Sequence, residues 1–441
     1  MTAVLHRLPR LPLPTAVSGE GCYLIDADGK RYFDGSSGAA VSSLGHQHPE
    51  IIEAMIDQIK RLSYAHSSFF TTEPMEQLGD FLAAHAPEGL DKVYFVSGGS
   101  EAVEAALKLA RQYFLEVNKP SKHLFIARKQ SYHGNTLGAL SAGGNMWRRI
   151  PFEPLLLKTT HISECNAYRG PNPGESLEDY GQRVANELET QILALGPDNV
   201  AGFLAEPVVG ATMGCVPAVK GYFKRIHDIC KKYDVLLILD EVMCGMGRTG
   251  TLFACEQEGI SADLITIAKG LGAGYVPIGA VMISNRIYDA IVNGTGYFQH
   301  GHTYIGHALA CATSLKVQQI IQRDNLLANV RNVGEALSTQ LKSRFANHPH
   351  VGDIRGRGLF WGLELVQDRA SKAPFSSSKG LNGKVKKIAK SHGLLCYPMG
   401  GTIDGQQGDH IMLAPPFIMR ENQIEFVVDT LEKTINEAVA L

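Results

Sequence analysis

The sequence predicts an α/β fold with a large unit built on a mostly parallel sheet and a smaller α+β unit. Two short apolar runs, residues 235–239 and 264–267, show no polar alternation, which is typical of parallel strands covered on both faces. Strand-like and helix-like patterns alternate through the middle of the chain. The length of 441 residues exceeds the roughly 100–200 residues of a typical domain, so two or three units are expected.

Composition and charge are those of an ordinary globular protein. Apolar residues make up 44% and charged residues 20%, and the net charge of −2 gives no general attraction to nucleic acid or to an anionic membrane. The eight cysteines form no C-x-x-C pair, which suits a reducing compartment. Residues 1–14 lack the apolar core of a secretion signal, and no run approaches the roughly 20 apolar residues of a membrane span. We therefore expect a cytoplasmic protein.

The first part of the chain predicts a hairpin and two helices. Residues 21–26 and 30–34 are strand-like and flank the turn signal Ala27-Asp28-Gly29. Residues 49–62 and 73–84 then place apolar side chains at the helical period.

The middle of the chain predicts the sheet. Residues 93–96 form a strand-like run, Ser97-Gly98-Gly99-Ser100 a tight turn and residues 101–114 a helical pattern. The further strand-like runs, with helices such as residues 222–232 between several of them, are residues 123–127, 201–205, 235–239, 264–267 and 280–283.

The remainder predicts two long helices and the smaller unit. Helical patterns cover residues 305–321 and 325–345, and residues 353–366 resemble a hairpin. The patterns that follow are helical at 385–392 and 421–438 and strand-like at 394–397 and 410–413. We expect three parts: an N-terminal segment that joins the smaller unit (1–60), a large unit (61–321) and a C-terminal small unit (322–441).

Two charged side chains stand at the ends of the predicted buried strands. Asp240 follows residues 235–239, and Lys269 follows residues 264–268. Open α/β sheets place chemistry just beyond the carboxyl ends of their strands, so a carboxylate and an amine are expected at one sheet edge. Burial would lower the pKa of Lys269 and suit it to form a Schiff base with an aldehyde. Taken singly, each residue is more simply a strand-end cap or a solvated lysine.

The turn at residues 97–100 is a candidate anion site. Free N–H groups and the dipole of the following helix point at it, and glycine lets the backbone approach closely. By itself this turn is more simply a helix cap, because serine is a good N-cap residue.

Six ordered motifs resemble those of class III aminotransferases, which are fold-type I enzymes that use pyridoxal 5′-phosphate (PLP). The motifs are Ser97-Gly98-Gly99-Ser100-Glu101-Ala102, Ser131-Tyr132-His133-Gly134, Ala205-Glu206-Pro207-Val208, Leu239-Asp240-Glu241-Val242, Ala268-Lys269-Gly270 and Gly301-His302-Thr303-Tyr304. The resemblance covers nearly the whole chain. It implies a PLP-binding unit with a mostly parallel, seven-stranded sheet.

The resemblance implies two catalytic residues. Lys269 forms the internal aldimine with PLP and, once released by an incoming amine, moves a proton between the substrate carbon and C4′. Asp240 pairs with the pyridine nitrogen and keeps it protonated, so the ring can accept electrons.

The resemblance also implies which residues surround the cofactor ring. Val242 and Tyr132 pack against its two faces. His133, next to Tyr132, is expected to take a ring-packing role rather than a catalytic one. Glu206 is implied to orient groups near the cofactor hydroxyl.

The cofactor phosphate is implied to be held by two subunits. Gly99 and Ser100 hold it at a helix N-terminus, and Thr303 reaches the phosphate of the neighbouring subunit. A homodimer or a larger homo-oligomer is then the working unit.

Three histidines close in sequence invite a metal interpretation. His300, His302 and His307 have donor atoms that zinc accepts. The resemblance instead places them in the phosphate-loop segment. We therefore expect no metal.

Substrate choice is read at positions that vary within the family. Relatives that act on ornithine or 4-aminobutyrate carry a glutamate where this chain has Ala211, which favours the ω-amino acid or amine:pyruvate branch. Several members of that branch carry a tryptophan where this chain has Ala40, so a wider pocket is expected. The arginine that many of them place before the Ala414-Pro415-Pro416 segment is absent.

Some other cation must then bind the carboxylate of the keto-acid acceptor, because a buried unpaired charge costs several kcal/mol. Arg148 and Arg149 are the candidates, since their loop follows the Tyr132 motif and could turn back over the cofactor. Phe69 is expected to line the pocket of the partner subunit.

Three functions stay open at this point. The first is PLP-dependent transfer of an amino group from an amine or ω-amino acid to a keto acid such as pyruvate. The second keeps the cofactor but makes the chain an epimerase, an aminomutase or a decarboxylase. The third is a non-catalytic protein on this fold.

Overall fold

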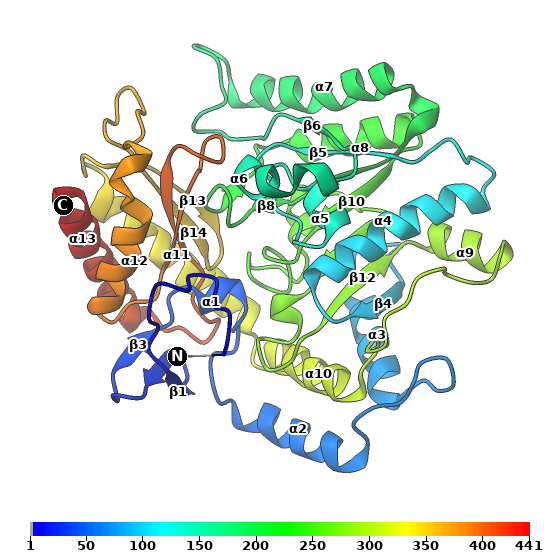
Figure 1. The fold of residues 1–441 in the computed structure, drawn as a ribbon, viewed down its shortest axis with the longest axis horizontal. Helices are drawn as coiled ribbons and strands as arrows, with labels where there is room; N and C mark the ends of the chain where they lie inside the picture. Colours follow the sequence, from blue (N-terminus) through cyan, green and yellow to red (C-terminus); the bar gives the residue numbers. More distant parts are fainter. Residues whose placement is uncertain (1–2) are drawn as a thin grey trace.

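A seven-stranded sheet forms the centre of the molecule, and the computed structural model describes residues 3–441 (Figure 1). Its strands, in spatial order, are β4 (Lys92–Val96), β12 (Gly279–Ile283), β11 (Leu264–Ile267), β10 (Leu236–Asp240), β7 (Val200–Ala205), β5 (Leu124–Arg128) and β6 (Thr160–Ile162). β12 runs antiparallel to both of its neighbours, and the other pairings are parallel. The prediction of a mostly parallel sheet is confirmed.

The two strands that carry Asp240 and Lys269 are buried on both faces. Leu237 and Leu239 of β10 belong to one apolar cluster, and Leu236 and Ile238 belong to the cluster on the opposite face. This two-sided burial explains the absence of polar alternation in the sequence. Because β10 and β11 pair in parallel, they end at the same edge of the sheet.

Helices cover both faces of the sheet (Figure 1). α4 (Gly99–Glu116) contributes Ala102, Ala106 and Leu109 to one cluster. The opposite cluster receives side chains from α3 (Glu73–His85), α7 (Leu177–Leu195), α8 (Tyr222–Lys232) and α10 (Ala308–Arg323).

A four-stranded antiparallel sheet forms the smaller unit, in the order β13 (Val351–Arg357), β14 (Phe360–Leu365), β16 (Asp409–Leu413) and β15 (Tyr397–Gly400). Its helices are α11 (Leu326–Phe345), α12 (Leu381–Ser391) and α13 (Ile424–Ala440). The N-terminal sheet, β1 (Ala16–Glu20), β2 (Tyr23–Asp26) and β3 (Arg31–Phe33), joins this unit through a bridge between Phe33 and Leu394. The predicted hairpin therefore has a third strand.

The division of the chain at residues 60 and 321 stays a prediction. Residue 321 falls near the end of α10, and this helix packs against both units: Cys311 lies in the core of the large sheet, whereas Val317 and Ile320 lie in the core of the smaller unit.

Several short elements were not predicted, and most of them are too short to show a period. They are α1 (Ser37–Ala40), α5 (Leu137–Ala142), α6 (Met146–Arg149), α9 (Asn285–Asn293), β6, β8 (Val208–Val209) and β9 (Val216–Pro217), whereas α2 (Pro49–Arg61) matches its predicted helix. The run predicted as a strand at 394–397 is displaced. Leu394 bridges to β3, and the strand begins only at Tyr397.

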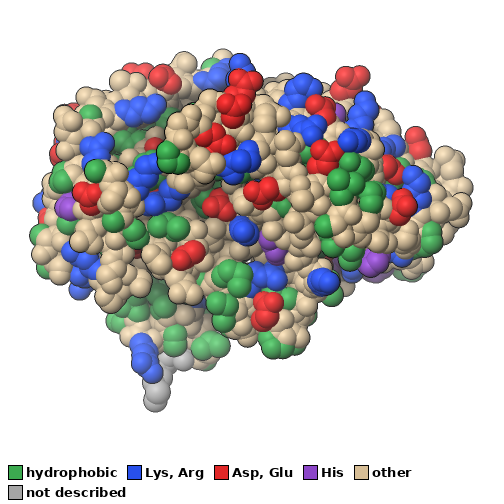
Figure 2. Space-filling model, turned by 90° about the horizontal axis from the view of Figure 1, so that it is seen from above, with side chains coloured by type: hydrophobic (Ala, Val, Ile, Leu, Met, Phe, Trp, Pro, Cys, Tyr) green, Lys and Arg blue, Asp and Glu red, His purple; other side chains and the backbone are tan. Residues whose placement is uncertain are grey.

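The surface carries mixed charge. Figure 2 shows acidic and basic side chains interspersed over one face, in keeping with the net charge of −2. Within residues 3–441, no helix combines the length and the apolar character needed to cross a bilayer.

Candidate active site

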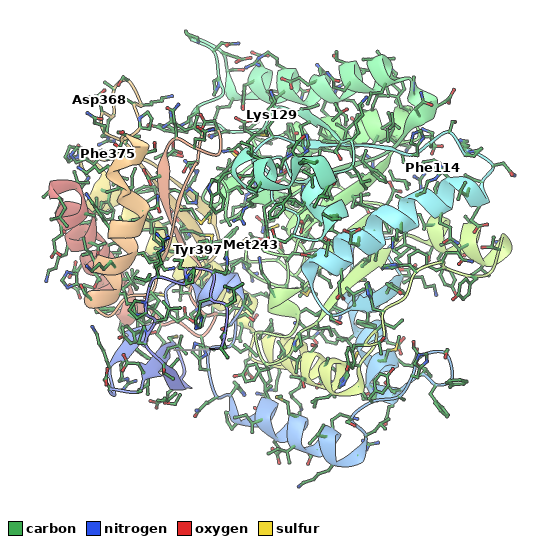
Figure 3. All side chains as sticks on the ribbon, viewed as in Figure 1. Phe114, Lys129, Met243, Asp368, Phe375 and Tyr397 are labelled. Carbon is green, nitrogen blue, oxygen red and sulfur yellow. The ribbon has the colours of Figure 1, made fainter. Side chains whose placement is uncertain are left out.

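A cavity of about 440 Å³ lies at the sheet edge where β10 and β11 end. Both units contribute to its wall: Met243 follows β10, and Tyr397 begins β15 of the smaller unit (Figure 3). The cavity contains both residues that the strand ends predicted, Asp240 and Lys269. Its place just outside the carboxyl ends of parallel strands is the usual site of chemistry in open α/β sheets.

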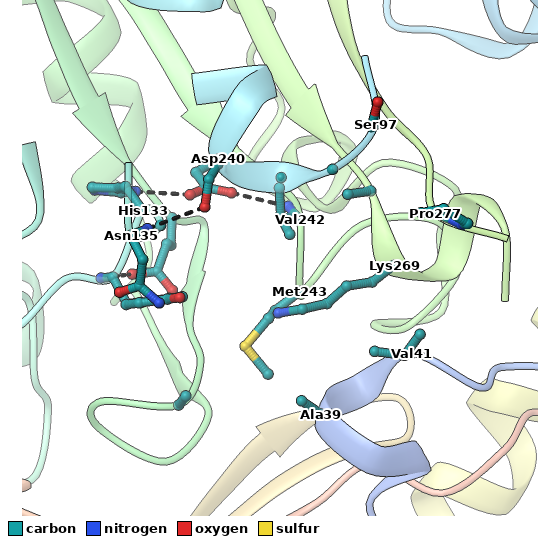
Figure 4. A pocket seen from close by; sticks show the side chains of 18 of the residues that line it. Ala39, Val41, Ser97, His133, Asn135, Asp240, Val242, Met243, Lys269 and Pro277 are labelled. Carbon is teal, nitrogen blue, oxygen red and sulfur yellow. Dashed lines mark hydrogen bonds and ion pairs between the residues drawn. The ribbon is translucent and has the colours of Figure 1, made fainter. Parts of the chain in front are cut away.

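The side chain of Lys269 extends into this cavity (Figure 4). The residue has φ of 44°, in the left-handed region that non-glycine residues rarely adopt, so the surrounding structure holds it in a strained position. Burial lowers its pKa to about 8, although the carboxylates of Asp240 and Glu206 oppose this shift. A sizeable fraction of the amine is therefore neutral and nucleophilic near neutral pH.

The carboxylate of Asp240 is fixed at both oxygens. The side chain is 4% exposed; Oδ2 lies 2.8 Å from His133 Nδ1, and Oδ1 accepts a 3.0 Å hydrogen bond from the backbone N–H of Val242 (Figure 4). His133 thus contacts the carboxylate and also lines the cavity, and its expected ring-packing role stays a prediction. A buried carboxylate held in this way can stabilise a positive charge that faces it.

The start of α4 remains a candidate anion site. This 18-residue helix has no side-chain N-cap hydrogen bond, so N–H groups of its first turn remain free. Gly99 lies against Val242, and a Cβ at Gly99 would stand 2.9 Å from Val242 Cγ1. The Ser100 hydroxyl accepts a 3.1 Å hydrogen bond from the N–H of Asn135. The close approach of backbone and the free N–H groups fit a phosphate.

Tyr132 and Glu206 form a connected part of the cavity wall. The Glu206 carboxylate accepts hydrogen bonds from the N–H groups of Tyr132 and Gly210, each at 3.0 Å. Burial raises the pKa values of Glu206 and of the Tyr132 phenol. Val242 also lines the cavity, so two apolar or aromatic surfaces are available to a flat ring.

The two arginines proposed for the acceptor carboxylate have different environments. Arg148 lines the cavity with its guanidinium 4.4 Å from the centre of the Tyr132 ring. Arg149 does not line it: its buried guanidinium donates to the carbonyl oxygens of residues 140, 141 and 143, with N···O distances of 3.2, 2.5 and 2.8 Å. Arg149 therefore stabilises the loop, and Arg148 alone remains a candidate.

Ala211 lines the cavity as expected, but Ala40 does not. The side chain of Ala40 is 3% exposed and lies in an apolar cluster with Val208, whereas its neighbours Ala39 and Val41 face the cavity (Figure 4). The expectation for Ala40 came from the resemblance, which places a tryptophan of relatives at this position. The backbone here is irregular, with positive φ at Gly38 and Ala40, 69° and 61°, and it turns Ala39 and Val41 to the cavity instead.

Phe69 and Thr303 lie outside the cavity of their own chain. Phe69 is 79% exposed. Thr303 is also exposed. Its carbonyl accepts a 3.0 Å hydrogen bond from the Tyr64 hydroxyl. Neither position conflicts with a role in a neighbouring subunit.

Of the three histidines singled out for a metal, His300 and His302 lie near each other, whereas His307 packs against Tyr64 and Tyr304. The rings of His300 and His302 are 4.8 Å apart, and His300 Nδ1 is 3.2 Å from Lys108 Nζ. Among the described side chains, residues 3–441, no group of three His, Cys, Asp or Glu is arranged to bind a metal ion.

Several cavity residues were missed by sequence reasoning, among them Arg7, Asn135, Met243 and Tyr397. Asn135 and Met243 follow recognised motifs directly, so proximity was an available signal. Arg7 and Tyr397 come from distant, irregular or displaced segments, and nothing in their local pattern indicates where they fold.

Comparison with known proteins agrees with this geometry. The family model described as "Aminotransferase class-III" matches residues 10–435. An uncharacterized aminotransferase from Schizosaccharomyces pombe is 46% identical over 97% of this chain and 93% of its own.

Two solved structures share the fold over almost their full length. An (S)-enantioselective ω-transaminase from Thermomicrobium roseum has a TM-score of 0.92 and 34% identity, covering 98% of this chain and 94% of its own. The ω-transaminase from Pseudomonas jessenii, solved in complex with PMP, has a TM-score of 0.93 and 32% identity, covering 100% and 96%. The fold is thus the PLP fold-type I architecture, and the chain belongs to the class III aminotransferase family.

Proposed function

We propose that this chain is a PLP-dependent transaminase that moves an amino group from an amine or ω-amino acid to a keto acid, with pyruvate as acceptor. The observation that carries the proposal is the Lys269 amine, whose pKa is lowered to about 8 in a cavity that also contains the fixed carboxylate of Asp240. A structural lysine has no need of a strained backbone and a lowered amine pKa. Lys269 is the residue that links to the cofactor.

The residues of this cavity fit PLP. The free N–H groups of α4, with Gly99 and Ser100, suit its phosphate, and Val242 and Tyr132 offer surfaces for its ring. Asp240 suits the protonated pyridine nitrogen, and Glu206 lies where it can orient groups near the ring hydroxyl.

Each residue then has a definite task. Bound PLP supplies an electron sink for the bond that breaks at the substrate carbon. With PLP bound, Nζ of Lys269 would move the proton between that carbon and C4′ of the cofactor. Asp240 keeps the pyridine nitrogen protonated, and His133 holds the Asp240 carboxylate in its orientation.

Arg148 is the proposed partner of the acceptor carboxylate. Its guanidinium lies over the rings of Tyr132 and Trp147 and, within residues 3–441, forms no hydrogen bond or salt bridge, so it has unused donors at the cavity wall. A carboxylate placed there satisfies this donor and makes a charge-assisted hydrogen bond.

A homodimer is the proposed working unit. Thr303 and Phe69 are exposed and lie outside the cavity of their own chain, as expected if they complete the site of a partner. Tyr64 and Tyr304, whose ring centroids are 5.9 Å apart, extend this aromatic surface around Thr303. Such a surface is typical of subunit interfaces.

A donor screen tests the proposed function. β-Alanine, taurine, aliphatic diamines and 1-phenylethylamine are each supplied with pyruvate or 2-oxoglutarate, and alanine or glutamate is quantified. Transamination forms the new amino acid in stoichiometric amount as the donor disappears. An epimerase would leave total amine unchanged, and a decarboxylase would release carbon dioxide. Protein without a visible absorption band that borohydride removes would instead indicate a non-catalytic chain.

A further inference from the structure

A second arginine reaches the cavity from the N-terminal arm, residues 3–15. Arg7 lines the same cavity as Arg148 and Lys269, and its charge acts on the Tyr132 phenol. The arm is drawn in dark blue beside α1 in Figure 1, and α1 supplies Ala39 to the same wall. A segment with no predicted structure thus delivers a cation to the site.

The arm is well placed to hold Arg7 there. Pro9, Pro12 and Pro14 restrict its backbone. Its end is tied to the N-terminal sheet, because the N–H of Ala27 donates a 2.9 Å hydrogen bond to the carbonyl of Thr15. The arm is therefore anchored at its end near Thr15, and it contributes Arg7 to the cavity wall.

The charge of Arg7 has no protein partner. Within residues 3–441 it forms no salt bridge with a carboxylate. The two carboxylates of the cavity are already used: Asp240 contacts His133 and the N–H of Val242, and Glu206 accepts from two backbone N–H groups. An unused guanidinium at the wall of a substrate cavity points to an anionic group on the substrate.

The two arginines differ in depth. Arg148 is partly buried against Tyr132, whereas Arg7 is exposed. A keto acid carries its carboxylate on the atom next to the reacting carbon, so it needs the inner cation. An ω-amino acid reacts through its amine at the Lys269 end and carries its carboxylate at the far end, so it needs a cation further out.

We infer that Arg7 binds the distal carboxylate of an ω-amino acid donor and so distinguishes ω-amino acids from neutral amines. Arg148 then binds the carboxylate next to the reacting carbon of a keto acid, and Arg7 binds the carboxylate at the far end of an ω-amino acid. This inference rests on the proposed transaminase function and adds the residue that recognises one class of donor.

The test compares a matched pair of donors, 5-aminopentanoate and pentylamine, which differ only in the terminal carboxylate. The quantity measured is the kcat/KM for 5-aminopentanoate divided by the kcat/KM for pentylamine, each with pyruvate as acceptor. A hydrogen bond to a charged group is worth about 1.5–3 kcal/mol, so Arg7→Gln is expected to lower this ratio by about 10- to 100-fold. Arg7→Lys should restore part of the ratio. Arg10→Gln, an exposed arginine of the same arm outside the cavity wall, is the control and should leave the ratio unchanged.

The outcomes separate the inference from the proposed function. An unchanged ratio in Arg7→Gln, or a wild-type protein that accepts pentylamine but no ω-amino acid, overturns the role of Arg7 and leaves the transaminase standing. A wild-type protein that transaminates neither donor, nor any other, overturns the proposed function itself.

Discussion

The inner and outer halves of the cavity are built on different principles. In the inner half, the carboxylates of Asp240 and Glu206 contact donor groups of the protein itself. Lys269 is held in a strained conformation at a strand end. In the outer half, Arg7 comes from the N-terminal arm and Arg148 from the short helix α6, and within residues 3–441 neither guanidinium forms a salt bridge. Fixed groups suit chemistry that every substrate shares, and unused donors suit recognition of what differs between substrates. Substitutions in the two halves should therefore fail in different ways.

The largest effect is expected at the centre of the inner half. Lys269→Ala removes the amine that transfers the proton, and proton transfer alone contributes up to about 10⁴-fold, so kcat should fall by at least that factor with every donor. Activity is measured with several donors, and circular dichroism verifies folding. A residual rate within tenfold of wild type would mean that the inner half does not depend on Lys269.

The next effect separates the outer half from the inner. Arg148→Gln should raise the KM for pyruvate by about 10- to 100-fold, because one charge-assisted hydrogen bond is lost, with a much smaller effect on kcat at saturation. Steady-state kinetics with varied pyruvate give both values. If kcat falls while KM stays constant, Arg148 belongs to the chemical machinery and the comparison is wrong at this residue.

A smaller effect is expected at His133, which contacts the Asp240 carboxylate. His133→Leu removes one of the two contacts that fix the Asp240 carboxylate, so kcat should fall about tenfold for all donors. His133→Asn places an amide donor near the position of Nδ1 and should recover most of the loss. The visible absorption spectrum of the cofactor-loaded protein should change in the Leu variant and return toward wild type in the Asn variant. Equal losses in both variants would reduce His133 to a packing residue.

The smallest effect is a pH dependence of stability in the cofactor-free protein. Burial lowers the pKa of Lys269 from 10.5 to about 8, so between these values the unfolded chain binds more protons than the folded chain. The contribution of Lys269 to the free energy of unfolding should therefore rise as pH increases from 8 to 10.5, by roughly 1–2 kcal/mol after allowance for its partial exposure. Lys269→Met carries no titrating amine and should be the more stable variant at pH 7. Its advantage should shrink over that pH window, and a constant difference would contradict the burial of a charged amine.

The inner half could be predicted from the sequence because regular structure positions it. Uninterrupted apolar runs predict buried strands. The residue that follows such a run lies at the sheet edge, as Asp240 does. The start of α4 was located by its glycine-serine turn before a long helical pattern, but this turn alone was more simply a helix cap, and only the resemblance implied a phosphate there.

The outer half could not be predicted in the same way. Arg7 sits on an arm without a period, and the facing of Ala39 rather than Ala40 depends on positive φ values that no local pattern revealed. Arg149 shows the same limit. Its carbonyl partners are in residues 140, 141 and 143, and only the path of the chain after α5 brings them to its guanidinium. Arg148 and Arg149 are adjacent in sequence, yet Arg148 lines the cavity and Arg149 binds backbone carbonyls outside it.

The central claim is that Lys269 is the amine that links to the cofactor, and one measurement tests it directly. The purified protein is reconstituted with PLP, reduced with borohydride, digested and examined by mass spectrometry. The account predicts that the cofactor is fixed to the peptide that contains Lys269. Attachment to a different lysine, or to none, would contradict it.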